Sequence, residues 1–307
     1  MLVSTNTAPF NKYGNHFEIV KLLKDAGFDA FDMTIRTSTV FLQWLMDIRE
    51  DMNVLTKEQV RALEEKGDSR LMDIPTAIKL REYADSIGIK CNQTHAPFPT
   101  ARLNKEGFNE YAFEEICTAI KISGILGAKI CIVHPCNDYS PEENAKIYNA
   151  LKQTAIESGV KIALENMWNW DTQNNHAAPA ACSDEQNFMQ HLELLDPNVF
   201  CACVDLGHAE MLGLNTSAVK MIKTLGKRVE CLHIHDNNKV DDNHTLPYVM
   251  NIEFEPIWAA LKEIGYEGDI TFEVDTFQKN FPNELMPAVA EFMCQTAKYI
   301  KSKVQKG

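Results

Sequence analysis

Apolar segments that end on a carboxylate or an imidazole recur along the second half of this chain. Four of them, KIALENM, CACVDLGH, CLHIHD and DITFEVD, carry Glu165, Asp205, His235 and Glu273 at or near their C-terminal ends. A short apolar run is typical of a strand buried on both faces, where an ionisable side chain has no packing role. Two further segments, KCNQTHAPFP and AKICIVHP, contain His95 and His134 in the same way. The pattern predicts a polar site where several parallel strands end.

Strand-like and helix-like segments alternate along the whole chain. The expected strands cover residues 2–7, 30–35, 89–95, 129–134, 160–165, 200–205, 229–235 and 269–274. The expected helices cover residues 16–26, 75–87, 109–126, 142–158, 184–195, 216–225, 254–264 and 284–303. Eight strand–helix units, without a glycine-rich phosphate loop after the first strand, favour an α/β fold of the (β/α)8 TIM-barrel type. Because no linker-like segment divides the sequence, we expect a single domain over residues 1–307.

Three long segments follow expected strands. Residues 37–72 form a charged, partly helical insertion after the second strand, and residues 166–183 and 236–252 form extended loops after the fifth and seventh. In TIM barrels the segments that follow strands lie at the face where enzymes build their sites. We therefore expect these loops to surround the site, and the insertion to be available for contact with a second copy in a homo-oligomer.

Charge and composition exclude several classes of protein. With 43 acidic and 30 basic residues the net charge is −13, which disfavours nucleic acids and anionic membranes as partners. No apolar stretch approaches the roughly 18–20 residues of a membrane helix, and the N-terminal sequence lacks the features of a signal peptide. The nine cysteines include no CxxC pair, so we interpret them as buried, reduced thiols of a cytoplasmic protein.

The four strand-end residues form a donor set rich in oxygen, with two Glu, one Asp and one His. Such a set suits Mn²⁺, Mg²⁺, Co²⁺ or Zn²⁺, and zinc is favoured if more than one site is occupied. Three carboxylates gathered without a cation would repel one another. For a single acid, helix capping or a local salt bridge is an equally good interpretation, but four together favour a metal site. His208, Asp242 and His244 are further candidates, whereas His16, His176, His191 and, with the least certainty, His233 are interpreted as structural.

The strand-end sequences THAPF, IVHP, ALEN, VDLGH, HIHD, DNH and FEV resemble the xylose-isomerase-like TIM barrel superfamily, which also contains endonuclease-IV-type enzymes. The resemblance covers nearly the whole chain. In the sugar branch it implies one metal site, formed by Glu165, Asp205, His235 and Glu273. In the nuclease branch it implies a three-zinc site to which further residues contribute, namely His95, His134, His208, Asp242 and His244.

Loop composition favours the sugar branch. The loops WNWDTQNNHAAPAAC and DNNKVDDNHTLPYVMNIEF contain almost no Lys or Arg, whereas a nuclease needs basic loops around its site. We expect a metal-dependent isomerase or epimerase that acts on a small sugar or polyol derivative through an enediolate. Glu165 and Glu273 would move the proton, and His208 would orient a substrate hydroxyl. The expected pocket walls are Trp168 and Trp170, together with His95.

The resemblance has one clear departure. Ketose epimerases of the family place an Arg shortly after the strand-seven histidine, but this chain has Asp236, Asn237, Asn238 and Lys239 there. A free-sugar epimerase is therefore in doubt, and an inositol-pathway dehydratase-like activity stays open. The sequence is also compatible with an endonuclease-IV-like zinc phosphodiesterase and with a non-catalytic ligand-binding barrel.

Overall fold

The computed structural model describes residues 1–41, 54–64 and 70–305. Residues 42–53 and 65–69, which belong to the insertion expected at 37–72, lie outside the described residues. The described part of that insertion contains the short helix α3 (Lys57–Arg61), which begins at a capping box formed by Thr56 and Gln59.

Parallel strands form the wall of a barrel, as the sequence predicts. Six pair in the order β2 (Ala30–Thr34), β3 (Lys90–His95), β4 (Ile130–Ile132), β5 (Lys161–Glu165), β8 (Phe200–Asp205) and β9 (Val229–His233). The remaining pair is β1 (Val3–Thr5) and β10 (Ile270–Phe272). Bridges between Asn6 and Asp32 and between Ile234 and Phe272 join this pair to both edges of the six-stranded sheet. The (β/α)8 TIM-barrel prediction is thereby confirmed.

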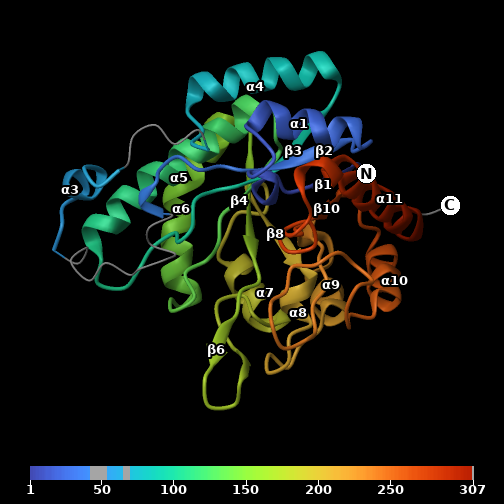
Figure 1. Ribbon diagram of the computed structural model, residues 1–307. Helices are drawn as coiled ribbons and strands as arrows, with labels where there is room; N and C mark the ends of the chain where they lie inside the picture. Colours follow the sequence, from blue (N-terminus) through green and yellow to red (C-terminus); the bar gives the residue numbers. More distant parts are fainter. Residues whose placement is uncertain (42–53, 65–69, 306–307) are drawn as a thin grey trace.

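Helices surround the strands in an outer layer (Figure 1). They are α1 (His16–Asp25), α4 (Ile74–Ile87), α5 (Glu106–Leu126), α6 (Pro141–Ser158), α7 (Glu185–Glu193), α9 (Ala218–Leu225), α10 (Phe254–Ile264) and α11 (Met286–Val304). Helix α6 shows how the sequence sets the boundaries. Ser140 caps its first turn through the Glu143 N–H, and Gly159 ends it in the left-handed conformation with φ 66°.

Side chains of β8 alternate between two cores. Ala202 and Val204 belong to the large core between strands and helices, whereas Cys201 and Cys203 belong to a small core inside the barrel. The inner core is completed by Ile132, Ala163 and Cys231. Small inner residues leave room for polar side chains one layer higher, at the C-terminal ends of the strands. All nine cysteines are free thiols, and all except Cys117 are buried.

Loops after the strands carry structure that the periodicity does not predict. The loop after β5 contains an antiparallel hairpin of β6 (Asn169–Asp171) and β7 (His176–Ala178), which projects from the barrel in Figure 1. Directly after β8 comes the short helix α8 (Leu206–Ala209). Among residues 1–41, 54–64 and 70–305, no helix has the length and apolar character needed to cross a membrane.

A buried carboxylate fixes the loop at 236–252. Asp236 Oδ1 accepts the N–H groups of Asn237 at 2.8 Å and Ile252 at 3.0 Å, and Oδ2 accepts that of Met250 at 2.7 Å. Backbone bonds between Asp236 and Thr245 close the loop further. The two ends of the loop are thus tied to one side chain.

Asp236→Ala should therefore lower the free energy of unfolding by about 2–4 kcal/mol, because three backbone N–H groups lose their acceptor. Asp241→Ala, an exposed aspartate of the same loop, should change it by less than about 0.5 kcal/mol. Urea unfolding monitored by circular dichroism compares the two variants. Equal values for both would contradict the anchoring role of Asp236.

Candidate metal centre

Four side chains meet where barrel strands end. Three of them are the last residues of β5, β8 and β9, and the fourth directly follows β10. Ligand atoms of Glu165, Asp205, His233 and Glu273 all lie within 4.8 Å of one another. His233 Nδ1 lies 3.1 Å from Glu165 Oε2 and 3.4 Å from Glu273 Oε2. We call these four residues the strand group.

The strand group contains His233 of β9 in the place expected for His235, and His235 belongs to a different set of possible ligands. Strand β9 pairs with β8 so that His233 lies beside Asp205, with a register shift between Ala202 and Cys203. His235 is two residues farther along, above the level of the other three ligands. It still contacts the group, because its Nε2 lies 3.0 Å from Asp205 Oδ1. The histidine interpreted as structural thus takes the position expected for His235.

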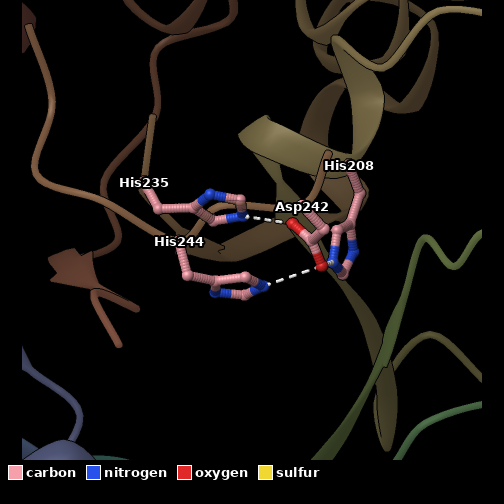
Figure 2. A group of neighbouring side chains, drawn as sticks. All are labelled: His208, His235, Asp242 and His244. Carbon is pink, nitrogen blue, oxygen red and sulfur yellow. Dashed lines mark hydrogen bonds and ion pairs between the residues drawn. The ribbon is translucent and has the colours of Figure 1, made fainter. Parts of the chain in front are cut away.

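His235 instead joins a second set of donors, which we call the loop group: His208, His235, Asp242 and His244. Figure 2 shows the Asp242 carboxylate between the ring of His208 on one side and the rings of His235 and His244 on the other. Asp242 Oδ2 lies 3.1 Å from His208 Nε2 and 2.9 Å from His244 Nε2. Asp242 Oδ1 lies 3.7 Å from His235 Nε2. The expected D-x-H pair and His208 are therefore neighbours in space.

Backbone carbonyls orient two rings of the loop group. His208 Nδ1 lies 2.9 Å from the carbonyl oxygen of Asn166, and His244 Nδ1 lies 3.1 Å from that of Glu273. Because a carbonyl only accepts hydrogen bonds, both Nδ1 atoms carry the proton. The Asp242 carboxylate only accepts hydrogen bonds, so each Nε2 donates a second proton to it, and a metal ion bound at the loop group would replace that proton. His244 also has φ 43°, a left-handed conformation that is rare for a residue other than glycine and is enriched at functional sites.

A third set consists of His95, His134 and Glu165. His134 Nε2 lies 3.2 Å from Glu165 Oε2, and His95 Nε2 lies 3.8 Å from the same oxygen. Glu165 therefore belongs both to this set and to the strand group. All nine residues expected as metal ligands lie in these three sets.

Buried polar atoms without hydrogen-bond partners fit cations at this place. Buried polar groups in folded proteins normally have a partner, so each exception needs an explanation. The atoms concerned are Glu165 Oε1 and Oε2, Asp205 Oδ2, Asp242 Oδ1, His95 Nε2, His134 Nδ1, His233 Nδ1 and Nε2, and His235 Nδ1. The strand group, with three oxygen donors and one nitrogen, suits Mn²⁺, Mg²⁺ or Co²⁺. The loop group, with three nitrogens and one oxygen, suits Zn²⁺.

Carboxylates and imidazoles of the site shift one another's pKa. Burial by itself raises the pKa of Glu165, but His233 and His134 hold it well below its usual range. Burial likewise raises the pKa of Asp205, but His208 and His235 lower it to about 2. The pKa of His208 is lowered by burial, yet Asp205 and Asp242 raise it to about 10. Glu165 and Asp205 are therefore ionised at neutral pH, and His208 holds a proton that a bound cation would displace.

The expected pocket walls differ in their surroundings. Trp168 packs against Ala177, Met211 and Leu214, and its Nε1 donates a hydrogen bond of 3.2 Å to Asp242 Oδ2. Trp170, on the projecting hairpin, is 38% exposed. Trp168 thus supports the loop group directly, whereas Trp170 has a face available to a ligand.

Sequence reasoning missed Asp32, which forms a set of possible ligands with His95 and His233. Asp32 is fully buried on β2. Its signal in the sequence is the same as that of the other residues, a single carboxylate inside the apolar segment AFDMTI. It was missed because it lies inside its strand and not at the end.

Replacement of His233 and His235 by alanine, one at a time, tests the placement of each histidine. His233→Ala should weaken Mn²⁺ binding by more than about 10-fold, because it removes a ligand of the strand group. His235→Ala should leave Mn²⁺ affinity nearly unchanged and weaken Zn²⁺ binding at the loop group. Electron paramagnetic resonance titration measures free Mn²⁺, and circular dichroism controls for folding. The opposite ranking of the two variants would restore the placement predicted from sequence.

Comparisons with known proteins agree with this barrel. The sequence profile of the family described as xylose isomerase-like TIM barrel matches residues 20–296. The uncharacterized protein MJ1311 of Methanocaldococcus jannaschii is 29% identical over 194 residues, which are 58% of this chain and 62% of that protein. The uncharacterized protein y4fM of Sinorhizobium fredii is 21% identical over 195 residues, 58% of this chain and 59% of that protein. This chain thus matches about three fifths of the length of each of these relatives.

Solved structures similar to this chain cover almost all of it. A D-tagatose 3-epimerase-like protein has a TM-score of 0.69 at 19% identity, covering 99% of this chain and 100% of its own. An L-ribulose 3-epimerase has a TM-score of 0.67 at 14% identity, and the match covers 99% of this chain and 94% of that one. The IOLI protein with a binding zinc atom has a TM-score of 0.67 at 21% identity, and the match covers 99% of this chain and 98% of that one. At these identities the likeness shows the fold. With the profile match over most of its length, the chain belongs to the xylose isomerase-like TIM barrel family.

Proposed function

We propose that this protein is a metal-dependent isomerase or epimerase acting on a small sugar or polyol derivative. The observation that carries the proposal is the strand group, Glu165, Asp205, His233 and Glu273, whose ligand atoms lie within 4.8 Å of one another at the barrel mouth. Membership of the family and the epimerase names of two similar structures support a sugar substrate.

A divalent ion in the strand group supplies Lewis-acid stabilisation of negative charge on a substrate carbonyl oxygen. Glu165 and Glu273 come from strands separated by β8 and β9 and act as the proposed base and acid. The ionised carboxylate of one takes the proton from the carbon beside the carbonyl, and the bonding electrons move into the enediolate. In an epimerase, the other carboxyl group, after taking up a proton from solvent or a substrate hydroxyl, delivers it to the opposite face of that carbon. In an isomerase, the proton returns to the neighbouring carbon.

His208 is the third proposed catalytic group. Its Nδ1 lies 3.6 Å from Glu165 Oε1 while its Nε2 faces Asp242 at 3.1 Å. From this position it orients a substrate hydroxyl or moves a proton between two substrate oxygens. This role requires that Nε2 is not bound to an ion in the loop group. Occupancy of the loop group therefore decides whether His208 acts on substrate or holds a metal.

The loops around the site support a neutral substrate. The loop at 166–183 has no Lys or Arg, and the loop at 236–252 has only Lys239. Lys239 is engaged, because its Nζ lies 3.5 Å from Glu210 Oε2. Trp170, Trp168 and His95 are the proposed walls for the apolar face of a sugar ring.

Solvent exchange at carbon tests the proposal. The protein is incubated in D₂O with Mn²⁺, Co²⁺, Mg²⁺ or Zn²⁺ and a panel of aldoses, ketoses and inositol-derived ketones, and proton NMR follows the carbon-bound hydrogen. We expect metal-dependent exchange for at least one substrate, with a loss of more than about 100-fold in Glu165→Gln and Glu273→Gln. Asp241→Asn, an exposed aspartate next to the loop group, should keep the wild-type rate.

Two results would contradict this assignment. Exchange that persists in Glu165→Gln with its metal bound would remove that carboxylate from the base role. Absence of exchange across the panel, with metal bound, would favour a non-catalytic ligand-binding barrel. Loss of water from a substrate, in place of simple exchange, would instead assign a dehydratase-like activity to the same residues.

One observation favours a second candidate, a zinc-dependent phosphodiesterase. The strand group, the loop group and the set of His95, His134 and Glu165 are adjacent, so three ions could be held together. Ions held there would activate a water molecule as the nucleophile for phosphoester cleavage. Three zinc ions per chain by elemental analysis, together with nicking of plasmid DNA at abasic sites, would establish this candidate and overturn the isomerase proposal.

A further inference from the structure

Asp32 faces two of the candidate metal ligands at once. Its Oδ2 lies 3.5 Å from His95 Nδ1 and 3.7 Å from His233 Nε2. The carboxylate is fully buried, so water does not compete for it. The two imidazole rings stack on each other, with centroids 4.4 Å apart and an angle of 27° between their planes.

The other nitrogen of each ring faces the site. His95 Nε2 lies 3.5 Å from Glu273 Oε1, and His233 Nδ1 lies 3.1 Å from Glu165 Oε2. Each ring is therefore placed between Asp32 on one side and the carboxylates of the strand group on the other. A histidine ring that binds an ion through one nitrogen and contacts a carboxylate through the other is held in one orientation.

The orientation of Asp32 is itself fixed by hydrogen bonds inside the barrel. Gln93 Nε2 donates to Asp32 Oδ2 at 3.1 Å, and Gln93 Oε1 accepts from Thr271 Oγ1 at 3.2 Å. Ser4 Oγ donates to Thr271 Oγ1 at 2.8 Å. The chain of bonds connects strands β1, β2, β3 and β10, including the two that flank the closing seam between β1 and β2.

We infer that Asp32 is a positioning residue that sets opposite tautomers in two stacked ligands. The negative charge of Asp32, 3.5 Å from His95 Nδ1 and 3.7 Å from His233 Nε2, favours a proton on these two nitrogens when the opposite nitrogen of each ring binds an ion. The lone pairs of His95 Nε2 and His233 Nδ1 are then directed into the site. His95 belongs to the set with His134 and Glu165, whereas His233 belongs to the strand group, so one carboxylate prepares ligands for two neighbouring ion positions.

The inference rests on the proposed metal centre, and ¹⁵N–¹H correlation NMR of the histidine side chains tests it in the zinc-loaded wild-type protein. The expected spectrum shows His95 protonated at Nδ1 and His233 at Nε2. His208 and His244 should both be protonated at Nδ1, because backbone carbonyls hold them. Any other tautomer at both His95 and His233 would overturn the inference without a mutant.

Asp32→Asn provides the second test, because the amide keeps the shape of the side chain but also donates hydrogen bonds. It should weaken Zn²⁺ and Mn²⁺ binding by about 10- to 100-fold and give mixed tautomers at His95 and His233 only. Asp32→Glu should restore part of the affinity. The matched control is Asp269→Asn, a partly buried carboxylate of the same barrel that accepts the Leu2 N–H at 2.6 Å. It should leave affinity and tautomers unchanged.

A folded Asp32→Asn protein with metal affinity within about twofold of wild type and unchanged tautomers would show that Asp32 is only structural. This result is distinguishable from failure of the proposed function. If carbon exchange is absent but affinity and tautomers respond as expected, the isomerase proposal fails and the role of Asp32 stands.

Discussion

Closure of the barrel forces carboxylates together, and the rest of the site depends on this constraint. Asp32, Glu165, Asp205 and Glu273 come from or directly after four strands, and the first three are fully or almost fully buried. Like charges at short range in a medium of low polarity repel strongly. Imidazoles lie between them, and the unpartnered oxygens of Glu165 and Asp205 face the same place. Such an arrangement is stable as a binding site for cations and is unfavourable as an ordinary core.

The two main groups differ in what holds them. Residues of the strand group project from or directly follow the barrel wall, so the hydrogen bonds of the sheet fix their positions. The loop group depends on helix α8 and on the loop at 236–252, which Asp236 fastens. Gly207 shows how closely these parts approach, because a side chain there would lie 2.0 Å from His235 Cε1. The wall thus carries the proposed chemistry, while the loops decide whether His208 contacts substrate or metal.

The sequence predicts the barrel well because its signals are local. Strand and helix periods, glycine at helix ends and apolar runs that stop at polar residues all act within a few residues of one another. The alternation of side chains along β8, with Cys203 in the inner core and Val204 in the outer core, is likewise a local property of a strand. The choice between His233 and His235 depends instead on the stagger between β8 and β9, which no local pattern encodes. The hairpin of β6 and β7 escaped prediction because its strands, NWD and HAA, are only three residues long and too short to show a period.

Crystals soaked in MnCl₂ offer the most direct test of the central claim. An anomalous-difference map should contain a peak bounded by oxygens of Glu165, Asp205 and Glu273 and by Nδ1 of His233. Metal–oxygen distances near those of hard divalent cations, about 2.0–2.6 Å, should accompany it. A map without density between these four side chains, in crystals whose other sites have bound manganese, would contradict the account.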